Sequence, residues 1–354
     1  MAKTTVDLSQ FEFNGKTLMA YNELIAEKML EIDDIKKAVT IFDDVVFNEE
    51  LGYIGEGGLI GKAGNVCKPE SDTFQVPVRR VLFEPKPWSA RLEICFTDFN
   101  TTCAVYAMKK GVKVSDLTGT DIEDVLIECV ARAMQKFLWR LFFFNDTAIK
   151  VQGTENGTLS IGENVQYWNI IDGFFKQIDV RCTENIKQKV SISANQGTSY
   201  ANQKLSKDDI DGILEDLYFN ASMVLRDQPD QVIICTQSFA DAYRKHLSST
   251  GELESMLRNY ENGVQTLTYQ GVTLAPFKIF DEIIAKHFNT GTKLINPHRA
   301  IYTTKSVLAA AMDSLESFSS FNMWYENKDK EVYVDLAGKA CANLLNPELF
   351  MYAG

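Results

Sequence analysis

The sequence is poor in the side chains that most often carry out chemistry. Its 354 residues include three histidines, His246, His287 and His298, and none stands at a metal-ligand spacing from another histidine, a cysteine or an acid. The seven cysteines form no C-x-x-C pair, and their odd number argues against a disulfide framework. We therefore expect no metal site, and we interpret the cysteines as reduced, small apolar residues.

The glycine-rich stretch 51–64 lacks the spacing of a phosphate-binding loop. Glu56 stands five residues before Gly61, where such a loop requires glycine, and Ala63 replaces the serine or threonine expected after Lys62. No G-x-G-x-x-G follows a predicted strand. We expect no nucleotide cofactor, and we interpret the stretch as a loop tip.

Positive charge is scarce. The chain carries 36 basic and 48 acidic residues, a formal net charge of −12, and residues 1–50 alone account for −6 of it. This balance excludes a protein that grips nucleic acid by its phosphates, but not one that encloses nucleic acid without gripping it. Residues 1–50 are therefore predicted to face solvent or a basic partner.

Long uncharged apolar runs are also missing. The start, MAKTTVDLSQFEF, has no apolar core of the kind a signal peptide needs, and the most apolar stretch, 120–145, carries charges along most of its length. We expect no membrane span and a protein that is made and used inside a cell.

The strongest element present is a helix predicted over 120–145. Thr120 and Glu123 have capping-box spacing, and apolar residues recur every three or four positions from Ile122 to Leu141. Leu138 to Phe144 is apolar nearly all round, apart from Arg140. At ~1.5 Å per residue the helix would be about 39 Å long.

The remaining elements predict an α+β fold, because strands and helices do not alternate regularly. Residues 1–17 look irregular and 18–42 helical, and strand-like runs in 51–99 are interrupted by Pro77, Pro85 and Pro87. Residues 183–206 are polar and predicted to lie on the surface. Helices are predicted over 168–177, 207–225 and 239–247, and strands over 231–236, 265–269, 272–275, 300–303, 321–326, 331–336, 340–345 and 349–352.

The C-terminal third contains a series of short motifs in a recognisable order. They are Tyr269-Gln270-Gly271-Val272, the run from Asn296 to Lys305 (NPHRAIYTTK), Asp313, Trp324-Tyr325 and Asn346-Pro347-Glu348-Leu349. With this series and the order of parts along nearly the whole chain, the sequence resembles the major capsid protein of tailed bacteriophages, the Hong Kong 97-type fold. The motifs are similar to those of phages that infect Bacteroidetes. Ala310-Ala311 departs from the pattern, which commonly has glycine before the aspartate.

The resemblance implies a division of the chain into parts. Residues 1–50 would be an N-terminal arm, 51–99 an extended β-hairpin loop, and 100–160 a peripheral domain containing the spine helix 120–145. Residues 161–317 would be an axial domain, and 318–354 the return strands of the peripheral domain. No long scaffolding domain precedes the arm, so we expect any scaffold to be separate or short.

The implied function is structural and not enzymatic. Copies would form the hexamers and pentamers of an icosahedral head in the virion, assembled in the bacterial cytoplasm around double-stranded DNA. Portal, scaffold and head-completion proteins are the implied partners. Two alternatives remain open: another self-associating phage protein, of the tail or a decoration, or a cytosolic enzyme with an unrecognised site. The Lys–Asn pair that cross-links some relatives has no position in this sequence.

Nine residues are predicted to make contacts between copies. The extended loop would lie across a neighbour's spine helix, so its arginines would meet acids of that neighbour, and the apolar end of the helix would present a contact face. The predicted residues are Gly55, Gly58, Lys62, Arg79, Arg80, Arg91, Trp139, Arg140 and Phe143.

Overall fold

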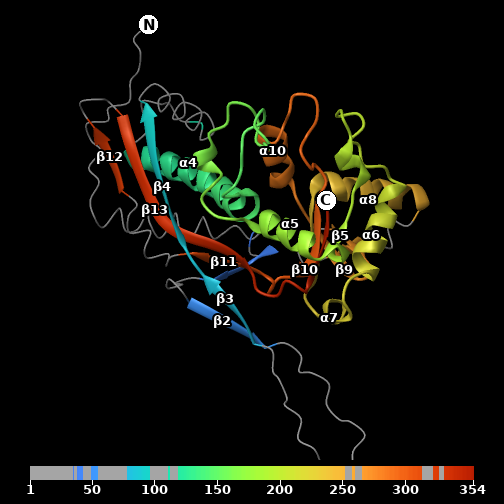
Figure 1. The fold of residues 1–354 in the computed structure, drawn as a ribbon. Helices are drawn as coiled ribbons and strands as arrows, with labels where there is room; N and C mark the ends of the chain where they lie inside the picture. The colour runs from blue at the N-terminus through green and yellow to red at the C-terminus, as the bar shows by residue number, and fades with distance from the viewer. Residues whose placement is uncertain are drawn as a thin grey trace, which may run out of the picture.

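The computed structural model has the predicted α+β architecture (Figure 1). It describes residues 35, 38–42, 49–54, 78–95, 111, 119–251, 257–259, 265–312, 322–326 and 331–354. Among these residues the strands form a five-stranded sheet, a seven-stranded sheet and a two-stranded ribbon. The two large sheets lie toward opposite ends of the molecule, and helix α4 with its continuation runs between them.

Helix α4 (Gly119–Trp139) continues directly into a π-helical turn, η3 (Arg140–Phe144), which confirms the long helix predicted over 120–145. The amide of Asn145 donates to the carbonyl of Arg140, 3.1 Å away, which closes the wider turn. The turn lies where the sequence is apolar on every side, and Leu141 to Phe144 are all buried. The helix therefore ends inside the protein.

The five-stranded sheet is organised around one long strand, β13 (Glu331–Leu344). The first part of β13 lies between β12 (Asn322–Glu326) and β4 (Lys86–Cys95), and its last residues pair with β11 (Leu308–Met312). Strand β1 (Thr40–Phe42) adds in parallel to β11, which corrects the helix predicted to reach Phe42. The predicted strands 331–336 and 340–345 are thus one continuous strand.

The seven-stranded sheet has the order β5-β14-β10-β6-β9-β8-β7. Its central pairs are β10 with β6, antiparallel, and β6 with β9, parallel. The strands are β5 (Lys189–Val190), β6 (Gln231–Thr236), β7 (Leu257–Asn259), β8 (Gln265–Tyr269), β9 (Val272–Phe277), β10 (Ala300–Thr304) and β14 (Phe350–Ala353). Four predicted strands, at 231–236, 265–269, 272–275 and 300–303, are confirmed in this sheet.

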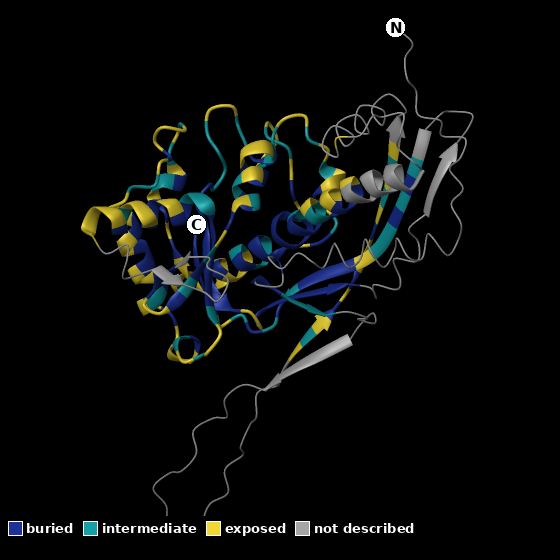
Figure 2. Ribbon diagram, turned by 180° about the vertical axis from the view of Figure 1, so that it is seen from behind, coloured by how far each residue is buried: buried dark blue, intermediate teal, exposed yellow. Residues whose placement is uncertain are grey.

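Helices cover both faces of the seven-stranded sheet, so alternate residues of β6 enter different cores (Figure 2). Val232 and Ile234 face α5 (Phe174–Glu184), α10 (Lys278–His287) and η3, whereas Ile233 and Cys235 face α6 (Asp209–Phe219) and α8 (Gln237–Thr250). Burial on both faces explains the unbroken apolar run of this strand. Short helical turns lie at α7 (Met223–Arg226), η4 (Val165–Tyr167), η5 (Ile186–Gln188) and η6 (Ser193–Gln196).

The two-stranded ribbon of β2 (Glu49–Ile54) and β3 (Val78–Phe83) leads into the five-stranded sheet. Strand β3 is followed, across Glu84 and Pro85, by β4, and Phe83 is buried against the alanines of β11. The amide side chain of Asn343 donates to the carbonyl of Leu82, 2.8 Å away. These contacts hold the base of the ribbon against the sheet.

Two strands pair with a sheet whose other strands lie mostly in a different predicted domain, and the predicted domain bounds themselves stay a prediction. Strand β11 lies within 161–317, the predicted axial domain, but belongs to the five-stranded sheet. Strand β14 lies within 318–354, the predicted return strands, but belongs to the seven-stranded sheet. The chain crosses from one sheet to the other at 305–307 and returns at 345–349.

Candidate functional site

The structure describes six of the nine predicted contact residues. Gly55, Gly58 and Lys62 lie outside the described residues, and Arg79 is described only as a backbone position of β3. Arg80, beside it, is exposed. The predicted role of these residues in contacts between copies stays a prediction.

Trp139 and Phe143 are buried in the core of their own chain, which corrects their assignment to a contact face. Their exposed fractions are 4% and 0%. The two rings stack at 5.3 Å, and both pack against Phe280 of α10, at 5.3 and 4.8 Å. The apolar end of the helix is the centre of an aromatic core, so neither ring is available to a neighbour.

Arg140 is also engaged within its own chain. Its guanidinium lies over the rings of Phe137, Tyr167 and Trp168 at 5.4 to 5.6 Å. Burial lowers the pKa of this arginine, and its Nε is buried without a hydrogen-bond partner. Contact with three ring faces favours the cation. The contact between Arg140 and Tyr167 thus holds the π-turn η3 against η4.

Arg91 has an acidic partner in its own sheet, and its predicted contact with a neighbour's acid stays a prediction. Arg91 on β4 faces Asp335 on β13, and two nitrogens of the guanidinium donate to the two carboxylate oxygens at 2.6 and 2.8 Å. The pair stabilises the register of β4 on β13.

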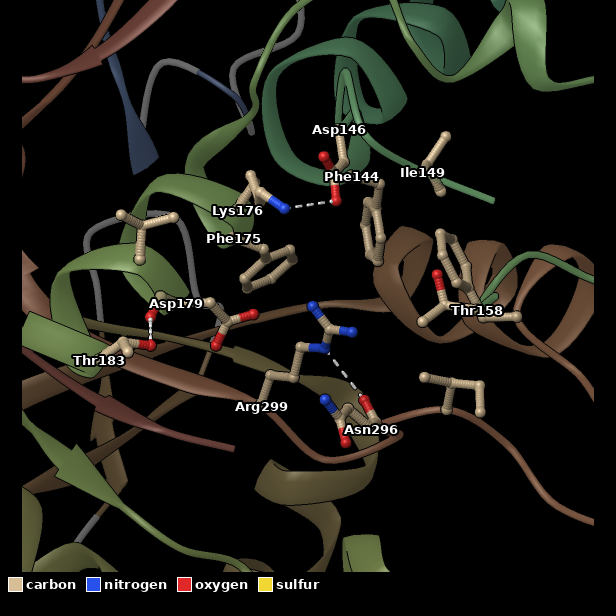
Figure 3. Close-up of a pocket in the computed structure, with 13 residues that line it drawn as sticks. Phe144, Asp146, Ile149, Thr158, Phe175, Lys176, Asp179, Thr183, Asn296 and Arg299 are labelled. Atoms are coloured by element: carbon tan, nitrogen blue, oxygen red, sulfur yellow. Dashed lines mark hydrogen bonds and ion pairs between the residues drawn. The ribbon is translucent and has the colours of Figure 1, made fainter. Parts of the chain in front are cut away.

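A cavity of about 300 Å³ opens beside the end of the π-turn, between α5 and the segment that precedes β10 (Figure 3). Six aromatic or aliphatic side chains form about half of its wall, and four charged side chains enter it. The lining residues are Phe144, Asp146, Ile149, Thr158, Phe175, Lys176, Asp179, Val180, Thr183, Phe288, Ile295, Asn296 and Arg299.

Arg299 is the most deeply buried of the four charged residues, with 7% of its surface exposed. Its guanidinium lies 4.5 Å from the centre of the Phe175 ring and 5.7 Å from that of Phe144. Its Nε donates to the carbonyl of Asn296, 3.0 Å away. Figure 3 shows the two outer nitrogens pointing away from Asn296, into the cavity. The side chain is therefore held in one orientation.

The other charged groups are unevenly compensated. Lys176 and Asp146 form an ion pair of 3.0 Å. Asp179 has no such pair among the described residues, and burial raises the pKa of its carboxyl, although Arg299 and two lysines act in the opposite direction. The cavity therefore combines an anchored guanidinium with one carboxyl group whose pKa is raised by burial.

Sequence reasoning missed this cavity. Arg299 belongs to the Asn296–Lys305 motif, but Asp146, Lys176 and Asp179 are far from it in sequence, and nothing in their spacing brings them together. The signal that was present is an arginine directly before the apolar strand Ala300–Thr304, a position that folding buries.

A second polar cluster lies between β6, α8 and α10. Ser238 Oγ and His298 Nδ1 are 2.9 Å apart, and Asp281 accepts hydrogen bonds from the amides of Gln237 and Ser238. These residue types occur in hydrolases, but His298 Nε2 is 2.6 Å from the carbonyl oxygen of Gln203 and the imidazole is buried. The cluster joins α8, α10 and the segment before β10.

Two negative findings concern only the residues described above. Within those ranges no three His, Cys, Asp or Glu side chains lie close enough together to hold a metal ion. Over the same ranges, no helix has the length and apolar character to cross a membrane.

Comparison with known proteins identifies the fold. No protein-family profile and no curated protein matches the chain. Among solved structures, the chain is similar to one from the procapsid of satellite phage P4, with TM-score 0.50 and 9% identity, covering 94% of this chain and 98% of that one. Matches to chains of Gordonia phage Cozz (TM-score 0.48, 11% identity, 90% and 85% covered) and of the native GTA particle capsid (0.46, 10%, 100% and 93%) are weaker. The fold of the P4 procapsid chain thus extends over nearly the whole of this one.

Proposed function

We propose that this chain is the major capsid protein of a tailed bacteriophage, the subunit whose copies form the hexamers and pentamers of an icosahedral head. The observation that carries the proposal is the fold shared with the P4 procapsid chain over nearly the full length of both chains. The protein would be located in the virion, after assembly in the bacterial cytoplasm.

The electrostatics support a shell that encloses double-stranded DNA without binding its sequence. A net charge of −12 would let packaged DNA move along the inner wall without adhering. Adhesion between copies would come mainly from apolar contact, at ~25 cal/mol per Å² buried, multiplied over many contacts per subunit. Portal, scaffold and head-completion proteins are the partners we propose with it. The Bacteroidetes host group rests on the sequence motifs alone.

The parts of the chain are proposed to act in the assembly as follows. Residues 1–50 are the arm, and 51–99 are the extended loop, which includes most of β2 and all of β3. Helix α4 is the spine of a peripheral domain that contains the five-stranded sheet. The lobe built on the seven-stranded sheet is the axial domain around which hexamers and pentamers close. Closed heterologous contacts of this kind are what a finite shell requires.

Size-exclusion chromatography and negative-stain microscopy of the purified chain test the proposal. Megadalton closed particles, or hexamers that convert to them, are expected. Open tubes would favour a tail protein. A chain that stays monomeric at every concentration and salt condition tried contradicts the proposal and leaves the enzyme alternative.

A further inference from the structure

The cavity beside η3 contains a buried cation without a contacting counter-ion. Arg299 is 7% exposed, and no ion pair of 4.0 Å or less joins it to a carboxylate of the described residues. Its Nε is used by Asn296, and its outer nitrogens point into the cavity (Figure 3). Burying a charge without a contacting partner is unfavourable, so a site of this kind is completed when an anion enters.

The geometry of the guanidinium favours one class of anion. Phe175 and Phe144 lie against it and hold its plane, and the hydrogen bond to Asn296 sets its direction. The two outer nitrogens of a planar guanidinium match the two oxygens of a carboxylate. Lys176 is already paired with Asp146, so Arg299 is the anchor.

We propose that this cavity receives a carboxylate, and that an aspartate or glutamate side chain of a second copy of this chain supplies it. The inference rests on the proposed function, because it needs a neighbouring copy.

Two observations favour a neighbouring copy over a free small carboxylate. The residues that line the cavity include Val180 of α5, which is 47% exposed. An exposed apolar side chain at a charged pocket suits a protein surface that covers it as a charged side chain of that surface enters. The chain also has 48 acidic residues against 36 basic ones, so unmatched carboxylates are plentiful on a second copy.

Substitution of Asp179 is expected to change the contact in the direction opposite to substitution of Arg299. Its carboxyl lines the same cavity, and a second carboxylate would be repelled whenever Asp179 is ionised. Neutral Asn at this position removes the repulsion and keeps the size of the side chain. The variant Asp179→Asn is therefore expected to strengthen the contact that Arg299→Gln weakens.

The experiment measures the lowest chain concentration at which particles form, by light scattering, for the wild type and three variants. We expect Arg299→Gln to raise this concentration about tenfold or more, and Asp179→Asn to lower it. Arg181→Gln is the matched control. Arg181 is on α5, the helix that carries Asp179, and is paired with Glu184 outside the cavity lining. Its substitution is therefore expected to change the concentration for particle formation by less than about twofold. Equal effects of Arg299→Gln and Arg181→Gln would overturn the proposal.

A cryo-microscopy map of the wild-type particle decides the matter even if Arg299→Gln does not fold. A neighbour's carboxylate within about 3.2 Å of the outer nitrogens supports the proposal, and a cavity without a neighbour's side chain overturns it. If the cavity in the particle holds no neighbour's side chain and glutarate binds the wild type but not Arg299→Gln, the carboxylate that the cavity receives comes from a small molecule. If the chain forms no particles, the proposed function is contradicted, and with it the neighbouring copy that this inference needs. If particles form and the cavity is unfilled, only this inference is contradicted.

Discussion

Arg91 and Asp335 face each other across β4 and β13, joined by two hydrogen bonds of 2.6 and 2.8 Å. The pair lies at the surface, where solvent screens it, so its contribution to stability is small. Hydrogen bonding from Arg91 lowers the pKa of Asp335. Because the pKa in the folded chain is below the unfolded value, the contribution is present above about pH 4 and is lost as the pH falls further.

The variant Asp335→Asn is therefore expected to melt slightly below the wild type at pH 7 and by a smaller margin at pH 3. Thermal melts of the unassembled subunit at the two pH values measure this. A larger difference at pH 3 than at pH 7 would contradict the assignment.

Phe143 at the centre of the aromatic core gives a second prediction. The ring is fully buried and contacts Phe174 at 5.2 Å, Phe280 at 4.8 Å and Trp139 at 5.3 Å. The substitution Phe143→Ala is expected to lower the free energy of unfolding by about 3–5 kcal/mol, measured by urea denaturation. The same change at Phe219, which is 50% exposed, is the control and should cost less than about 1 kcal/mol. Similar losses at the two positions would show that Phe143 is not in the core.

The turn between β8 and β9 gives a third prediction. Gln270 and Gly271 have φ of 48° and 83°, the left-handed region that a tight hairpin turn requires. The substitution Gly271→Ala is expected to destabilise the subunit by about 1–2 kcal/mol. Gly212→Ala, at an exposed helical position of α6 with open space around the new methyl group, should instead stabilise it by roughly 0.5–1 kcal/mol. Chemical denaturation of both variants checks whether the signs differ.

His298 gives a fourth prediction, which concerns pH. The carbonyl of Gln203 can only accept, so His298 Nε2 carries the proton and Nδ1 accepts from the hydroxyl of Ser238. Burial lowers the pKa of the imidazole, although Asp281 and Gln203 act in the opposite direction. The folded pKa is therefore below the unfolded value, and stability that is present above about pH 6.5 is lost as the pH falls toward the folded pKa.

Urea midpoints between pH 8 and pH 5 for the wild type and His298→Gln test this expectation. The wild type should lose more stability than the variant across this range. His246 and His287 are common to both proteins, so the difference reports His298. Equal shifts of the urea midpoint in the two proteins between pH 8 and pH 5 would contradict the prediction.

The last prediction concerns the glycine-rich stretch. Deletion of Gly55–Gly64 is expected to leave a folded subunit that no longer assembles, because the stretch is predicted to reach a neighbour. Circular dichroism checks the fold and negative-stain microscopy checks assembly. Normal particles from the deletion would contradict the loop's predicted role.

Elements whose pattern is local were predictable. Strand β6 has five apolar or β-favouring residues, Val232 to Thr236, between polar flanks, and Gln270-Gly271 separates two strand-like runs. The predicted bounds of β6 and β8 therefore match the structure. The helix predicted over 168–177 lies instead at Phe174–Glu184, because Trp168 and Ile171 pack against the core before the helix begins.

Elements that depend on distant residues were not predictable in full. Gly338 reads as a break between two strands, but the ring of Trp88 lies where a side chain would be, with ring atoms 3.1 to 3.3 Å from the position of an added Cβ. The glycine thus admits the tryptophan, and β13 continues through it.

The candidate cavity shows the same limit. The polar stretch 183–206 reads as surface, but Asn195 and Gln203 are buried, and they hydrogen-bond to the backbone at Leu294 and His298. These bonds hold the segment that presents Arg299. No pattern within 183–206 reveals a hydrogen-bond partner about a hundred residues away. The sequence alone therefore gives no sign that Arg299 is held in a buried position, and it suggests a charged residue exposed to solvent.

The pairing of the last strands has a consequence for the time at which the chain can fold. Strand β14 lies between β5 and β10, and β13 joins β4, β11 and β12. Neither sheet is complete until residues 331–353 have left the ribosome. A chain still being translated therefore lacks the centre of one sheet and an inner strand of the other, although most of the strands that pair with them have already been made. The two sheets are thus expected to be completed late in synthesis, by the same short stretch of chain.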